Sequence, residues 1–190
     1  MHTNLLWKAK EYPSLENCVV TITDAGSEIS SVVIGTSENK MFRVEYTIKT
    51  NRYWETEHFE IKSQIAGSSE SFSFYSDGKG NWQANGQPLT LYQGCIDIDL
   101  PLTPFTNTLP IKRLDLKIAQ QQLIKVIYLD LLNQEIKPVT QKYTRLSEHE
   151  YKYENVPNDF EAVIRIDELG LVVDYPSLFE RIARIDKTGL

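Results

Sequence analysis

The chain has few of the residues that build metal sites or disulfide frameworks. Its 190 residues include two cysteines and three histidines. His2, His58 and His149 are scattered, so we expect no metal, and the lack of a glycine-rich phosphate loop or a GxSxG elbow predicts no cofactor and no common nucleophile. Cys18 and Cys95 have no CxxC context and no neighbouring histidine, which predicts small, reduced, buried side chains.

Positive charge is also in deficit. There are 20 Lys and Arg residues against 26 Asp and Glu, a net charge of -6 with a pI of about 5.2. A nucleic-acid binder needs a basic footprint, so we expect no nucleic-acid partner. The apolar run 123–132 is too short to span a bilayer and is interrupted by charges, which predicts no membrane insertion. Residues 1–8 show no secretory signal pattern, so we expect a cytoplasmic protein.

What the chain does have is alternation with a period of two. In the segment 42–49, apolar Phe42, Val44, Tyr46 and Ile48 alternate with polar residues, as in a strand with one buried face. The same pattern predicts strands at 17–23, 54–61, 71–75, 95–100, 114–118, 123–131, 160–167 and 171–175.

Turn residues separate these runs and predict a meander. Asp77–Gly80 and Asn85-Gly86 are typical of hairpin turns, because both contain residues that accept a positive φ. Short helices are predicted from Asn107 or Thr108 through Leu114, and at 177–180, which has capping-box spacing. No linker or repeat interrupts the pattern, so residues 1–190 are expected to form one mainly β domain, a meander that rolls into a barrel or sandwich.

One strand carries two carboxylates. Asp97 and Asp99 lie two residues apart, so they share a face, about 6–7 Å apart along the strand. Three interpretations remain: a solvated outer face, an ion pair of either Asp with Arg113 or Lys112 that holds the central turn, or an acid–base pair of a hydrolase. The frequency of surface carboxylates favours the solvated face.

Two further groups of side chains suit a ligand. Residues 103–107 include Thr106 and Asn107, which could bond sugar hydroxyls, although capping of a turn and a helix start is the commoner role of such residues. Tyr151 and Tyr153 share one strand face and could line an apolar cavity with their hydroxyls directing a polar group. Both tyrosines could equally be core residues.

Several segments, taken in order, resemble a known family. The segments are 80–82, 94–99, 104–110, 112–114, 141–144, 151–153, 160–162 and 167–176. As a set they resemble the putative glycolipid-binding family of bacterial proteins. That resemblance implies a spiral β-roll, a single long antiparallel sheet rolled around a short helix, similar in shape to periplasmic lipoprotein carriers. Since this fold has one helix, one of the two helices predicted above would be a strand or a turn.

The resemblance and the alternation together favour a non-enzymatic binding protein for a glycolipid or another amphipathic small molecule. The ligand would lie on the concave face of the sheet, gaining about 0.8 kcal/mol for each buried methylene. The candidate contacts are Asp97, Asp99, Thr106, Asn107, Arg113, Tyr151 and Tyr153. Two alternatives are a carbohydrate or lipid-headgroup hydrolase that uses Asp97 and Asp99, and a protein-interaction module with an exposed edge strand or aromatic patch. Whether the concave face is hollow, and the oligomeric state, stay open at this stage.

Overall fold

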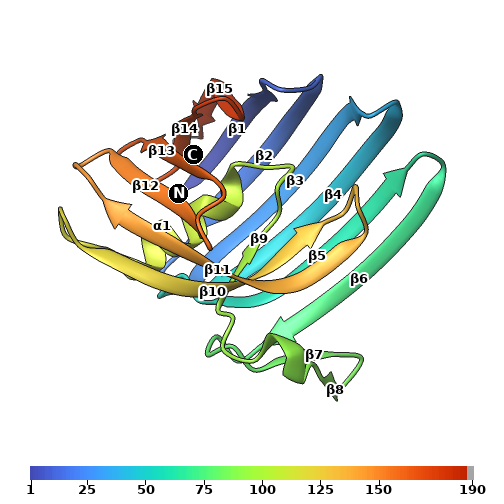
Figure 1. The fold of residues 1–190 in the computed structure, drawn as a ribbon, viewed down its shortest axis with the longest axis horizontal. Coiled ribbons are helices and arrows are strands. Elements are labelled where there is room, and N and C mark those ends of the chain that lie inside the picture. Colours follow the sequence, from blue (N-terminus) through green and yellow to red (C-terminus); the bar gives the residue numbers. More distant parts are fainter. Residues whose placement is uncertain (188–190) are drawn as a thin grey trace.

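A single rolled sheet dominates the computed structural model, which describes residues 1–187 (Figure 1). Fifteen strands pair in the order β8-β7-β6-β5-β4-β3-β2-β1-β15-β14-β13-β12-β11-β10-β9. All neighbours are antiparallel except β9 and β10. The strands are β1 (His2–Ala9), β2 (Ser14–Ile22), β3 (Gly26–Ser37), β4 (Lys40–Asn51), β5 (Thr56–Ile65), β6 (Ser68–Ser76), β7 (Trp82–Ala84), β8 (Gln87–Pro88), β9 (Asp97–Asp99), β10 (Gln121–Asp130), β11 (Glu135–Arg145), β12 (Glu150–Val156), β13 (Glu161–Ile166), β14 (Val172–Tyr175) and β15 (Phe179–Asp186).

The sheet consists of two meanders joined by the pairing of β1 with β15. The chain between the two meanders runs along the concave side of the sheet. It contains the 3-10 turns η1 (Thr90–Tyr92) and η2 (Phe105–Asn107) and the one α-helix of residues 1–187, α1 (Thr108–Leu114). Figure 1 shows α1 inside the curve of the sheet. The predicted mainly β fold, a rolled sheet around one short helix, is confirmed, and the sheet is open rather than closed into a barrel.

Alternation explains which face of the sheet is buried. In β4, Phe42, Val44, Tyr46 and Ile48 are each 4% exposed or less, whereas the residues between them are exposed or half-buried. Their neighbours on β2, β3 and β5 follow the same phase, because directly opposed residues in a sheet point to one face. We call this buried side, which faces α1, the inner face, and the opposite side the outer face.

The inner face is filled by the chain's own side chains. One cluster of buried residues joins the β1–β5 meander to the crossing segment, where Phe105 and Leu109 have no exposed area. A second cluster fills the β10–β15 meander, with Tyr143, Tyr153 and Tyr175 among its largest members. Burial on this scale is the main stabilising contribution in such a fold. The middle of the concave side is thus packed, and smaller hollows of about 360 and 280 Å³ remain at its rim, next to the turn between β10 and β11.

Most of the predicted elements are present, and two are wrong. The helix through Leu114 is confirmed, but the segment 114–118 is not a strand, since Asp115 ends α1 with a left-handed φ of 41°. The helix at 177–180 is also wrong. Ser177 lies in a turn with φ 65°, and Phe179 begins β15, because pairing with β1 and β14 supplies more hydrogen bonds than one isolated helical turn.

The predicted turns and cysteines agree with the structure. Asn85 and Gly86 have φ values of 50° and 74° and join β7 to β8, as a two-residue hairpin requires. Gly78 and Gly80, in the predicted turn after β6, also have positive φ. Both cysteines are free and fully buried.

Candidate functional site

Asp97 and Arg113 form a buried ion pair between β9 and α1. Arg113 Nη2 lies 2.5 Å from Asp97 Oδ2, and Arg113 Nε donates to both carboxylate oxygens at 3.1 and 3.2 Å. The Asp97 side chain is fully buried and that of Arg113 is 14% exposed. Burial raises the pKa of Asp97 and the guanidinium opposes that rise. The solvated-face interpretation is therefore wrong, and of the three interpretations the ion pair with Arg113 is the one that the structure contains.

Asp99 is held by neutral partners. Gln141 Nε2 donates to its Oδ2 at 2.6 Å, and Thr106 Oγ1 donates to its Oδ1 at 3.3 Å. Burial raises the pKa of Asp99 to about 6, against the lowering effect of these two hydrogen bonds. The two carboxylates thus differ in environment, one beside a cation and one beside an amide and a hydroxyl.

Asn107 and the tyrosines extend this polar cluster. Tyr143 donates its hydroxyl hydrogen to Asn107 Oδ1 at 2.8 Å, and the Asn107 side chain makes no helix-capping bond. Tyr153 packs edge-on against Tyr143, with ring centroids 5.4 Å apart, and donates to Asn155 at 2.6 Å. Tyr151 points to the same side of β12, but its ring contacts the Arg145 guanidinium, 5.7 Å away.

The structure therefore brings most of the predicted contact residues into one internal cluster. Asp97, Asp99, Thr106 and Asn107 are all buried or nearly so, and each has a hydrogen-bond partner within the protein. Such an arrangement fixes α1 and η2 against the sheet. The polar atoms of this cluster already form hydrogen bonds with one another. Contact of the cluster with a ligand stays a prediction.

A further buried carboxyl, that of Glu16, was missed by the sequence analysis. Glu16 Oε1 accepts from Tyr46 Oη at 2.6 Å and from Ser31 Oγ at 2.7 Å, and the Tyr46 hydroxyl also meets Thr103 Oγ1 at 3.2 Å. Glu16 Oε2 is buried without a hydrogen-bond partner among the described residues. Burial raises the pKa of Glu16 to about 7. The sequence did hold a signal for this burial, because Glu16 alternates with Cys18 in β2 and so points to the same, buried face.

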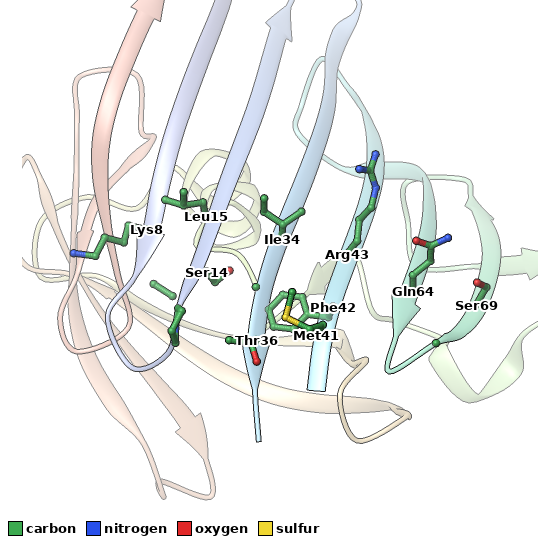
Figure 2. Close-up of a pocket in the computed structure, with 14 residues that line it drawn as sticks. Lys8, Ser14, Leu15, Ile34, Thr36, Met41, Phe42, Arg43, Gln64 and Ser69 are labelled. Atoms are coloured by element: carbon green, nitrogen blue, oxygen red, sulfur yellow. The ribbon is translucent and has the colours of Figure 1, made fainter. Parts of the chain in front are cut away.

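A hollow lies on the outer face, across β1 to β6 near one end of these strands (Figure 2). Its volume is about 1000 Å³, at the upper end of the range for small-molecule sites. Exposed apolar side chains line it, Leu15, Ile34 and Met41, which are 43%, 50% and 73% exposed. All three interrupt the polar phase of their strands, which is the sequence signal that could have revealed this surface. We call this hollow the outer groove.

The outer groove follows one row of directly opposed residues. In register across the six strands, Lys8 faces Leu15, Leu15 faces Ile34, Ile34 faces Arg43, Arg43 faces Gln64 and Gln64 faces Ser69. Figure 2 shows these six side chains side by side. Five steps of about 4.8 Å give a length of about 24 Å, more than the ~15 Å thickness of one bilayer leaflet. The middle of the row is apolar and both ends are polar.

Comparison with known proteins now adds to this geometry. The family described as "Putative glycolipid-binding" matches residues 4–181. The chain belongs to this family. The crystal structure of a DUF1089 family protein from Pseudomonas aeruginosa is similar, with a TM-score of 0.81 and 32% sequence identity over 88% of this chain and 92% of that chain. No curated protein matches the chain.

Family membership agrees with the resemblance seen in the sequence, and the family's description concerns binding rather than a reaction. Within residues 1–187, no helix has the length and apolar character that crossing a membrane requires. Over the same residues, no group of three or more His, Cys, Asp and Glu side chains is placed to hold a metal ion.

Proposed function

We propose that this member of the family binds a glycolipid or similar amphipathic small molecule in the outer groove, without catalysis. The observation that carries the proposal is a hollow of about 1000 Å³ whose floor is formed by exposed Leu15, Ile34 and Met41. Exposed apolar surface of this kind is a feature of ligand grooves, because covering it removes apolar area from water. The packed inner face supports placing the ligand outside the sheet.

The end of the outer groove near β6 suits a polar headgroup. Arg43 donates to Glu45 through Nε and Nη2 at 2.9 and 2.7 Å, and both side chains remain about half exposed. Gln64 and Ser69 continue the row beyond Arg43. Amide, hydroxyl and paired charged groups are donors and acceptors suited to sugar hydroxyls. An acyl chain would then lie over Leu15 and Ile34, with the headgroup towards β6.

The direct test is native mass spectrometry of the protein as purified from its expression host, followed by organic extraction. We expect added mass that extraction releases as lipid or glycolipid. A protein that carries no such mass and takes up none from a lipid mixture would contradict the proposal.

Replacing Ile34 with aspartate tests the location. A charge in the middle of the apolar floor removes a contact of about 1.5–3 kcal/mol, so we expect lipid uptake to weaken about tenfold or more. Ile182→Asp is a matched control, since Ile182 is 49% exposed and lies on β15, outside the outer groove. Equal uptake by the Ile34→Asp variant and the control would place the ligand elsewhere.

The alternative function, a hydrolase, would use the buried carboxyl groups of Asp97 and Asp99 as its acid and base. The raised pKa of Asp99 is a property that general acids share. Against this, neither Asp97 nor Asp99 lines the outer groove. We assign both to the framework of the fold, so Asp99→Asn is expected to leave lipid uptake unchanged.

A further inference from the structure

Strand β6 has a long edge without a neighbouring strand. Residues 68–75 pair with β5, but β7 pairs only with Tyr75 and Ser76. Residues 68–74 therefore border the sheet, and Figure 1 shows this part of β6 at its margin. Unpaired strand edges are templates for pairing with another strand.

The turn before β6 determines which backbone groups point outward. Ala66 and Gly67, with φ values of 50° and 88°, join β5 to β6 as a two-residue hairpin in which Ile65 faces Ser68. The two residues that flank such a turn, Ile65 and Ser68, exchange both backbone hydrogen bonds. Along β6, the backbone N–H and C=O groups then point alternately towards β5 and away from it. The N–H and C=O groups of Ser69, Ser71 and Ser73 therefore point away from β5. In agreement with this phase, Tyr75 is paired with β7.

These outward groups have no partner among the residues that the structure describes. Among residues 1–187, no hydrogen bond reaches the backbone N–H or C=O of the three serines from the side opposite β5. Their side chains lie on the outer face, and Ser73 Oγ contacts His58 Nε2 at 2.8 Å. The row of three serines is thus an uncharged edge with free hydrogen-bonding capacity.

The other borders of the sheet carry the usual protection. Strand β8 is two residues long and ends in Pro88. Strand β10 is covered by β9 at residues 126–128 and carries Lys125. Residues 68–74 contain no Pro, Lys or Arg and a single charge, that of Glu70. Short strands, lysine and proline normally prevent edge-to-edge association.

We propose that two copies of this chain pair through antiparallel β6 edges, related by a twofold axis at Ser71. In that register Ser71 faces its counterpart in the partner copy, and Ser69 faces the partner's Ser73. Each chain supplies three N–H and three C=O groups, and each N–H meets one C=O of the other chain, which makes six hydrogen bonds.

The β6 edge is complementary to itself. The three residues whose backbone groups point outward, Ser69, Ser71 and Ser73, are all serine. A twofold arrangement therefore places small neutral side chains opposite one another and brings no like charges together in this row. On the inner side, half-buried Phe72 and Phe74 lie at the margin of the core and gain cover from the second strand. Twofold pairing also closes on itself, which leaves neither of the two edges free for further growth.

Sedimentation equilibrium of the full chain tests the proposal. We expect a dimer that dissociates on dilution. Ser71→Pro removes an N–H that the monomer does not use, and two such bonds are lost per dimer, so the dissociation constant should rise about tenfold or more. Ser71→Lys places like charges opposite each other at the axis and should also yield monomer. Ser30→Lys adds the same charge to an exposed position on the outer face of β3 and should leave the dimer intact.

A cross-link locates the contact. Opposed Cα atoms in a hydrogen-bonded antiparallel pair are about 5.5 Å apart, within disulfide range. Ser71→Cys should form a covalent dimer on oxidation, and Ser30→Cys should not. A wild-type chain that stays monomeric at high concentration, or a dimer that Ser71→Pro and Ser71→Lys leave unchanged, would overturn the proposal. Lipid uptake is measured separately, so failure here does not bear on the outer groove.

Discussion

Replacing Arg113 with methionine is expected to lower the free energy of unfolding by about 3–5 kcal/mol, because it leaves the buried Asp97 carboxylate without its cation. Asp97 is fully buried and its bidentate contact with Arg113 joins β9 to α1. Methionine keeps much of the length and apolar volume of the arginine side chain. Urea denaturation of the two proteins measures the difference.

A double variant separates charge from packing. Asp97→Asn combined with Arg113→Met removes the isolated charge and should recover part of the lost stability. Lys117→Met is the control for a cation lost at an exposed position, where we expect a change of about 0.5 kcal/mol or less. If Arg113→Met were no more destabilising than Lys117→Met, the ion pair would not hold the central turn.

Replacing Glu16 with glutamine is expected to stabilise the protein at pH 8 by about 3 kcal/mol. Burial raises the pKa of Glu16 from 4.5 to about 7, so the folded state binds a proton more tightly than the unfolded state. The contribution of Glu16 to the free energy of unfolding is fully present below pH 4.5 and is lost as the pH rises through about 7. Glutamine has the same shape, accepts from Tyr46 and Ser31 through its amide oxygen, and never ionises.

The measurement is the free energy of unfolding at pH 5 and at pH 8. The gap between the Glu16→Gln variant and wild type should widen with pH, because only wild type ionises at this position. The buried Asp99, whose pKa is raised to about 6, contributes the same slope to both proteins and cancels in the comparison. Glu57→Gln, at an exposed position on β5, is the control. Parallel pH profiles for Glu16→Gln and wild type would show that Glu16 does not control the pH response.

The strands and turns were predictable because they depend on local rules. Alternating residues in β4 point to opposite faces whatever the rest of the chain does, and Asn85-Gly86 accepts the positive φ of a hairpin anywhere. The helix at 177–180 failed for the converse reason. Its capping-box spacing is also local, but the segment 179–186 gains a long ladder with β1, broken by one bulge, and β1 lies at the far end of the sequence.

At the candidate site, too, some features followed from the local sequence and others only from the tertiary structure. An ion pair of Asp97 or Asp99 with Arg113 or Lys112, which lie in the same short segment, was one of three interpretations of the sequence, and the favoured one was a solvated face. The sequence did not predict their burial, because β9 runs inside the roll and is covered on both sides, so that Asp97 and Ile98 are both buried. Alternation distinguishes two faces only where one of them meets water.

The sequence by itself determined the class of fold, the direction in which most strand side chains point and the membership of a binding family. The tertiary structure alone decided what each face meets. The crossing segment and α1 fill the concave face, and the lateral register of six strands assembles Leu15, Ile34 and Arg43 into the outer groove. The register of the strands, and which segment covers each face of the sheet, depend on contacts between residues distant in sequence. No local pattern encodes them.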